Sequence, residues 1–171
     1  MNTNQSCELF EVNEKDIELV HSIESCGFPD DEAATKEKLM YRLKVASPFF
    51  RVLSTLNEKG ERGEAIGYVG GTCTNEIHLI EESMELNSHI DQGTTLNIHS
   101  VVILKEYRRK GYATKMLTAF IEQMKKKNVP PLKRVVLICK THLIDFYKGC
   151  GFKLEGKSEV VHGKDQWYEM V

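Results

Sequence analysis

Apolar positions along the chain recur with two different periods, and these periods predict the secondary structure. The mixed run 7–12 predicts a first strand. Three apolar residues then recur at the spacing of an amphipathic helix, Ile17, Val20 and Ile23. A second helix is expected over about 31–46, with its apolar residues on one face.

The next part of the chain has the pattern of a hairpin. Two runs with strand character, 49–56 and 65–74, flank a polar, glycine-containing turn at 57–63. The segment 75–93 is polar and irregular, with a helical turn expected near 82–86. Antiparallel pairing of the two strands follows from the short turn between them.

The clearest pair of elements comes after this segment. The stretch 95–104 is the most strand-like of the chain, and 111–127 is its most amphipathic helix. Asn128-Val129-Pro130-Pro131 is expected to end that helix, and 134–139 reads as a buried strand. A strand, a helix and a strand of these lengths predict parallel strands joined by a right-handed crossover.

The C-terminal part completes the order of elements. A short helix is expected at 143–148, and strands near 159–161 and 166–170 flank a turn at 162–165. Hairpins in the first half and one crossover predict an α/β (α+β) fold. The sheet is then mixed and mostly antiparallel, with about seven strands and helices on both faces. No linker or composition break divides the chain, so one domain over 1–171 is expected.

Composition narrows the class of protein. Hydrophobic residues make up 41% and charged residues 28%, the balance of an ordinary globular protein. The polar start does not resemble a signal peptide, and no apolar run reaches membrane-spanning length. We therefore expect a cytoplasmic protein with no membrane partner.

Charge and cysteine content exclude further classes. The net charge of −2 provides no field that would recruit nucleic acid, and a monomer is expected. The five cysteines are odd in number and scattered, without a C-x-x-C pair. This argues against a disulfide framework and against a structural zinc site, so no metal is expected.

One basic cluster interrupts the even distribution of charge. Arg108-Arg109-Lys110-Gly111 lies between the strand 95–104 and the helix that follows. A helix N-terminus presents free backbone N–H groups and a partial positive charge, which suit a pyrophosphate, and glycine allows close approach. With a single glycine the segment matches neither a P-loop nor G-x-G-x-x-G. A solvated helix face is the alternative interpretation.

This arrangement resembles the Gcn5-related N-acetyltransferase (GNAT) fold, in which an R/Q-x-x-G-x-G/A segment binds the pyrophosphate of coenzyme A. Other segments resemble the arylalkylamine (serotonin-type) branch of that superfamily, in its fungal or protozoal form. They are Phe28-Pro29, Glu82-Ser83-Met84, Ile98-His99-Ser100-Val101-Val102 and Leu143-Ile144-Asp145-Phe146-Tyr147.

The resemblance implies acetyl-CoA as cosubstrate and a set of contacts for it. The pantetheine arm would meet the backbone of Val101, Val102 and Ile103. Arg108 would open the pyrophosphate motif, which continues through Arg109, Lys110, Gly111, Tyr112, Ala113 and Thr114. Pro48 and Phe49 would help to wall the amine pocket, and Tyr147 would sit beside the sulfur.

Acetyl transfer to an amine needs a general base and a general acid. His99 is the candidate base because its ordinary pKa of about 6.5 suits proton transfer near neutrality. Strand alternation would place it on the same face as Asn97 and Val101. Tyr147 is the candidate acid for the departing thiolate. A packed histidine and a core tyrosine are the structural alternatives.

Asn97 departs from the pattern of the vertebrate enzymes, which have His-x-His on this strand. Asparagine cannot accept a proton, so a relay of two histidines is not available. Asn97 is expected to hold a water or the amine, with the proton passing through water to His99.

The sequence thus predicts an acetyl-CoA-dependent N-acetyltransferase that acts on a primary arylalkylamine by direct attack in a ternary complex. A polyamine acetyltransferase is the nearest alternative, and an acidic, open cleft would favour it. A protein lysine or N-terminal acetyltransferase would need an open peptide groove. A CoA-binding module without activity is the remaining alternative.

Overall fold

The computed structural model describes residues 5–127 and 132–171. The segment 128–131, expected to end the long helix, lies outside the described residues. Within the described residues, seven strands form one sheet in the order β1-β2-β3-β4-β5-β7-β6, and of their pairings only β4–β5 is parallel. In chain order they are β1 (Cys7–Glu11), β2 (Phe50–Leu56), β3 (Arg62–Thr74), β4 (Thr95–Ile103), β5 (Arg134–Cys139), β6 (Leu154–Lys157) and β7 (Tyr168–Met170).

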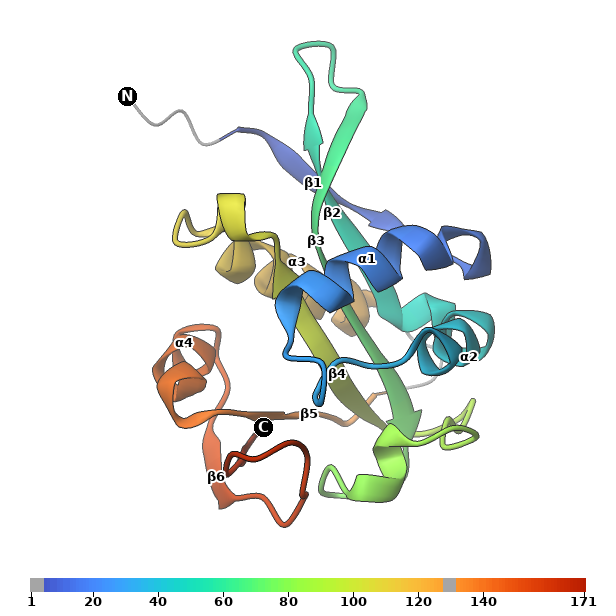
Figure 1. Cartoon of the computed structure of the whole chain (residues 1–171), viewed down its shortest axis with the longest axis vertical. Coiled ribbons are helices and arrows are strands. Elements are labelled where there is room, and N and C mark those ends of the chain that lie inside the picture. Colours follow the sequence, from blue (N-terminus) through green and yellow to red (C-terminus); the bar gives the residue numbers. More distant parts are fainter. Residues whose placement is uncertain (1–4, 128–131) are drawn as a thin grey trace.

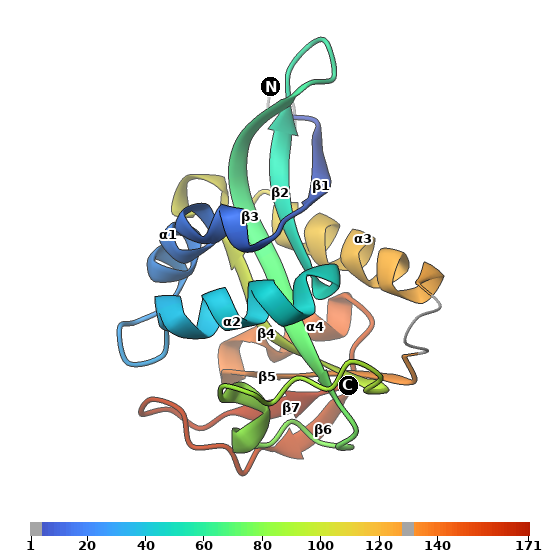
Figure 2. The same ribbon diagram turned by 90° about the vertical axis from the view of Figure 1, so that its right-hand side faces the viewer.

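Helices cover both faces of this sheet, as predicted. Two of them, α1 (Ile17–Gly27) and α2 (Lys36–Ala46), pack side by side on one face. The long helix α3 (Tyr112–Lys126) lies on the opposite face (Figures 1 and 2). The short α4 (Ile144–Gly149) follows β5. Within 5–127 and 132–171, no helix is long and apolar enough to cross a bilayer.

The second helix begins later than the sequence predicted. Its first residue is Lys36, not a residue near 31. The cause is a cap, because the Thr35 side chain accepts a hydrogen bond from the Lys38 backbone N–H at 3.2 Å. Residues 28–35 therefore form a connection between the helices, here called the α1–α2 loop.

The penultimate strand also differs from its prediction. It forms at Leu154–Lys157, not near 159–161, and pairs antiparallel with β7. The apolar residues that suggested a strand have other roles. Val160 packs with Leu79 and Val136 in a small second core, and Val161 is 75% exposed.

Two features of β4 create space next to this strand. Its parallel ladder with β5 pairs Thr95–Asn97 with Arg134–Val136. Beyond this ladder β4 continues to Ile103 and β5 to Cys139 without pairing to each other. On its other edge, Ser100 pairs with Gly70 and Ile98 with Gly71, so His99 is an extra residue opposite β3. Such a bulge bends the strand and redirects the side chains beside it.

Candidate active site

A cavity of about 400 Å³ lies between the C-terminal half of β4, the end of β5 and the α1–α2 loop. His99 from β4 and Tyr147 from α4 both line it. Carboxylates and cations also line this cavity: Glu24, Asp30, Asp31, Glu32, Lys38 and Arg42. The two side chains expected to exchange protons with the reactants therefore share one space.

His99 is held by one hydrogen bond. Its Nε2 lies 2.7 Å from the Thr72 hydroxyl oxygen, and its Nδ1 is buried without a partner among the described residues. Burial, followed by the charges of Arg42 and Lys38, lowers the pKa of His99 well below 6.5. The imidazole is therefore neutral at pH 7, which is the form that can accept a proton.

The predicted alternation along β4 stops at the bulge. Ile98, His99, Ser100 and Val101 all line the cavity, whereas Asn97 does not. The Asn97 amide nitrogen donates to the Thr74 hydroxyl at 3.0 Å, and its Oδ1 is buried without a partner in the described part of the chain. That oxygen is the atom that could hold a water, and this role stays a prediction.

Tyr147 is 7% exposed and packs edge-on against the rings of Phe146 and Phe152, at centroid distances of 4.9 and 5.9 Å. Burial raises the pKa of Tyr147 well above its ordinary value of 10, and the thiols of Cys139 and Cys150 raise it further. The phenol therefore keeps its proton at neutral pH, and its O–H can donate a hydrogen bond to negative charge that develops beside it, such as that on a departing thiolate.

The basic turn before α3 is open to solvent. Gly111 caps the helix with φ +84°, and, apart from its two chain neighbours, no described residue lies within 4 Å of the position a Cβ would take. Arg109 also has a positive φ, of 58°. No side chain of the described residues caps α3, so its first N–H groups remain available to an anion.

The side chains next to Gly111 differ in their hydrogen bonds and in their exposure. The Arg108 guanidinium donates to the Ile103 carbonyl at 2.8 Å, and Lys110 Nζ donates to the Glu106 carbonyl at 2.9 Å. Tyr112 is buried, whereas Thr114 is exposed and Ala113 half-buried. Arg108 thus ties the turn to the end of β4 and does not present its side chain freely.

The strand residues expected at the pantetheine arm lie beyond the ladder with β5. Val101, Val102 and Ile103 form the last part of β4, past its final pair with β5 at Asn97. Backbone groups on the facing edge of β4 are therefore positioned beside the gap into which an extended chain could pair.

Pro48 and Phe49, which were expected to wall the amine pocket, lie outside the cavity that contains His99 and Tyr147. Both belong to the short 3-10 turn Ser47–Phe49 that follows α2, where Pro48 is exposed and Phe49 is buried. The Phe49 ring is 6.1 Å from that of His89.

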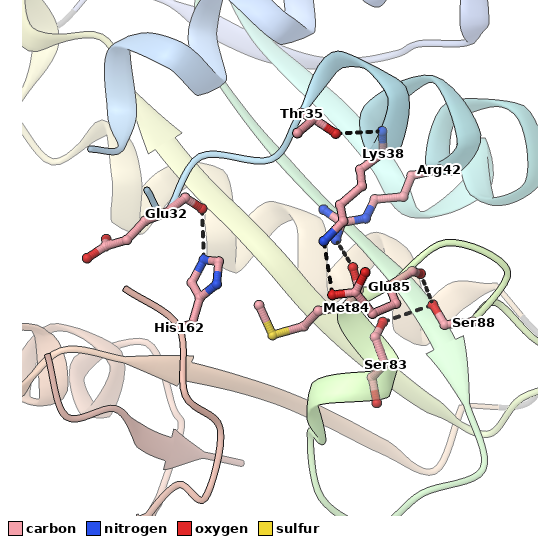
Figure 3. A network of polar contacts seen from close by, with 9 residues as sticks. All are labelled: Glu32, Thr35, Lys38, Arg42, Ser83, Met84, Glu85, Ser88 and His162. Atoms are coloured by element: carbon pink, nitrogen blue, oxygen red, sulfur yellow. Dashed lines mark hydrogen bonds and ion pairs between the residues drawn. The ribbon is translucent and has the colours of Figure 1, made fainter. Parts of the chain in front are cut away.

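Two charged residues of this site are buried, although the sequence pattern does not single them out. Glu24 is 2% exposed and accepts hydrogen bonds from the Ala34 N–H, at 2.9 Å, and from the Tyr68 hydroxyl. Arg42 is buried and donates to the Met84 carbonyl at 2.9 Å (Figure 3). Glu24 continues the apolar stripe of α1 seven residues after Ile17, and this position was the available signal.

The sequence does not indicate a role for Glu32, because its segment is predicted to be helical. It lies in the α1–α2 loop, where Lys140 Nζ approaches its Oε1 to 2.7 Å. Its carbonyl accepts a hydrogen bond from His162 Nε2 at 2.8 Å (Figure 3). These contacts connect the loop to the end of β5 and to the turn before β7.

Comparison with known proteins agrees with this architecture. Residues 17–152 match the family model "Acetyltransferase (GNAT) family". A serotonin N-acetyltransferase from Mesocricetus auratus is 26% identical over 110 residues, which are 64% of this chain and 51% of the relative. The chain thus spans about half the length of the curated relatives it matches.

Solved structures show the same fold at low identity. The loading GNATL domain of CurA from Lyngbya majuscula has a TM-score of 0.80 at 12% identity, covering 96% of both chains. Arabidopsis thaliana Naa50, in complex with the bisubstrate analogue CoA-Ac-MVNAL, has a TM-score of 0.69 at 15% identity, covering 96% of this chain and 97% of that one. Because the family model matches most of its length, this chain belongs to the acetyltransferase (GNAT) family.

Proposed function

We propose that this protein transfers the acetyl group of acetyl-CoA to the primary amine of an arylalkylamine. The reaction is direct attack in a ternary complex. The observation that carries the proposal is the single cavity lined by both His99 and Tyr147, beside the end of β4. Membership of the family and the similarity to serotonin N-acetyltransferase support the same reaction.

Acetyl-CoA supplies an activated acetyl group and a thiolate leaving group. The turn at Gly111 would hold its diphosphate through the first N–H groups of α3, since that turn is exposed and uncapped by any described side chain. The last part of β4 would offer its backbone to the extended arm, as an added strand does. Together these contacts would aim the thioester into the cavity.

His99 would act on the amine. An alkylamine with a pKa near 10.4 is neutral in only about one molecule in 2,500 at pH 7, so a base is needed. The neutral imidazole offers Nδ1, which has no partner among the described residues, as the acceptor, directly or through a water molecule. The nitrogen then forms a bond to the acetyl carbon as the carbon–sulfur bond breaks. The amide nitrogen loses its second proton, and the protons removed from the nitrogen leave through His99 to solvent.

Tyr147 would act on the leaving group. Its raised pKa keeps the phenol protonated, so that its O–H is available as a donor to the departing sulfur as negative charge develops there. Passage of the proton to the sulfur would prevent the reverse reaction. The phenolate would regain its proton afterwards from solvent. No metal is part of this scheme.

The lining of the cavity supports the acceptor class. Phe28, Tyr147 and Trp167 contribute aromatic rings, which suit an arylalkylamine. The four carboxylates of the lining favour a polyamine as the second candidate acceptor. Both acceptors require the same chemistry at His99.

A thiol-release assay tests the reaction and separates the two acceptors. The protein is incubated with acetyl-CoA and tryptamine, phenethylamine or spermine, and released thiol is titrated while the acetylated amine is identified by mass. We expect the highest kcat/KM with tryptamine or phenethylamine. A preference for spermine would identify a polyamine as the acceptor. No thiol release with any of the three amines would contradict both candidate functions.

A further inference from the structure

The α1–α2 loop carries one buried carboxylate that is only half satisfied. Glu32 is 6% exposed, and its Oε1 forms the contact with Lys140 described above. Its other oxygen, Oε2, is buried and has no hydrogen-bond partner among the described residues. An unsatisfied oxygen on a buried carboxylate is costly, and such atoms are rare unless a ligand or an ion completes them.

The surroundings of Glu32 hold it in place. His162 donates to its carbonyl, and Lys140 contacts its side chain. On another side it packs against the turn at Gly163, where an added Cβ would lie 2.8 Å from the Glu32 Cγ. The carboxylate therefore has little freedom to turn away from the cavity that it lines.

Negative charge also exceeds positive charge around Glu32 and Lys140. Lys140 is shared, because its Nζ lies 2.7 Å from Glu32 and 3.1 Å from Asp165. Two carboxylates around one ammonium leave a net charge of about −1 beside the cavity. One more cationic group at Glu32 would neutralise it.

The other acidic residues of the lining do not offer the same site. Both oxygens of Glu24 accept hydrogen bonds from the protein, and Asp30 and Asp31 are exposed to water. The cations of the lining, Lys38 and Arg42, lie apart from Glu32 in the network of Figure 3. They also depress the pKa of His99, so positive charge is disfavoured at the histidine.

We propose that Glu32 binds an alkylammonium group of the acceptor amine and is a specificity-determining residue of this cavity. This inference rests on the proposed function, because it takes the acceptor to be an amine. Glu32 attracts the charged group, whereas His99, near Lys38 and Arg42, favours the neutral nitrogen that attacks. The group held at Glu32 is either the ammonium of a monoamine before deprotonation or the second ammonium of a diamine.

The test compares Glu32→Gln with Asp165→Asn. Both substitutions remove one negative charge next to Lys140, but only Glu32 lines the cavity. Binding is measured by calorimetry in the presence of CoA, without turnover, for tryptamine, 1,4-diaminobutane and 4-amino-1-butanol. The uncharged alcohol tryptophol serves as the neutral analogue of tryptamine.

We expect Glu32→Gln to weaken binding of at least one ammonium ligand by about 10- to 100-fold, the value of a charge-assisted hydrogen bond. Asp165→Asn should change ammonium binding by less than about threefold, as expected for an exposed ion pair. Tryptophol should bind both variants as it binds the wild type. Loss for all three amines assigns Glu32 to the reacting ammonium, whereas loss for 1,4-diaminobutane alone assigns it to a second ammonium.

Unchanged ammonium binding in Glu32→Gln, or an equal loss in Asp165→Asn, would overturn the proposal. Thermal unfolding checks that each variant is folded. Should Glu32→Gln not fold, Glu32→Asp keeps the charge and withdraws the oxygen by one methylene, and wild-type affinity in that variant would also overturn it. Because calorimetry needs no acetyl transfer, failure of the thiol-release assay is a separate result that concerns the proposed function.

Discussion

Gly111→Ala tests whether the turn before α3 binds the diphosphate. Gly111 has φ +84°, and the space where a Cβ would point is empty. Gly60 provides a matched control, because it has φ +76°, also faces empty space, and lies in the turn between β2 and β3. The two glycines thus share a left-handed backbone conformation, which would strain an alanine equally at both positions, and they differ in their position relative to the site.

The expected magnitudes follow from this match. A residue with a Cβ in the left-handed region costs about 1–2 kcal/mol, and neither alanine meets a steric clash. In a chain of this size each kcal/mol lowers Tm by about 2–4 °C, so both Gly111→Ala and Gly60→Ala should lose about 2–8 °C. Only at Gly111 would the methyl group displace a phosphate oxygen from a backbone N–H. The loss of such a charge-assisted bond should weaken acetyl-CoA binding by about 10- to 100-fold.

Calorimetry with acetyl-CoA and thermal unfolding measure the two effects separately. Similar Tm losses, with weaker acetyl-CoA binding in Gly111→Ala alone, are the expected result. If both variants bind acetyl-CoA as the wild type does, the diphosphate is not at Gly111. If both lose affinity equally, the effect comes from stability and the assignment of the turn is wrong.

Three further predictions follow from the site. Tyr147→Phe should lower kcat by about 100-fold or more with little change in the KM for acetyl-CoA, and wild-type turnover would contradict a role as acid. Because the pKa of His99 is lowered, the acid limb of kcat/KM should lie below pH 6.5. Lys38→Met should raise that pKa and move the limb to higher pH, and a pH–rate profile that does not move would refute the coupling. Tyr68→Phe removes a donor from buried Glu24 and should cost about 1–3 kcal/mol, which thermal unfolding measures as a fall of about 2–12 °C; an unchanged Tm would contradict it.

Local periodicity determined most of the secondary structure of this protein. The strand predicted at 134–139 forms over those same residues, and the amphipathic helix predicted at 111–127 forms as Tyr112–Lys126. The order of the elements also agrees with the prediction. The apolar stripe of a helix and the alternating face of a strand are each visible within about a dozen residues. The sequence of one chain is therefore enough to predict them.

The site was only partly predictable. His99, Tyr147 and Gly111 could be named because each stands in a short segment that resembles a known pattern. The bulge that makes His99 an extra residue depends on how β4 pairs with Gly70 and Gly71, two residues of a strand distant in sequence. Glycines inside a strand were the available signal for that bulge.

The remaining site residues were decided by tertiary structure alone. Glu32, Lys140 and Asp165 come from three separate segments, and their charges acquire meaning only where the loop meets the end of β5 and the last turn. An acidic residue in a polar segment is predicted to be exposed to water. Contacts between distant segments bury it instead and remove water from the carboxylate. The sequence by itself therefore determined the elements and the motif. The contacts between those elements decided which charged residues line the cavity.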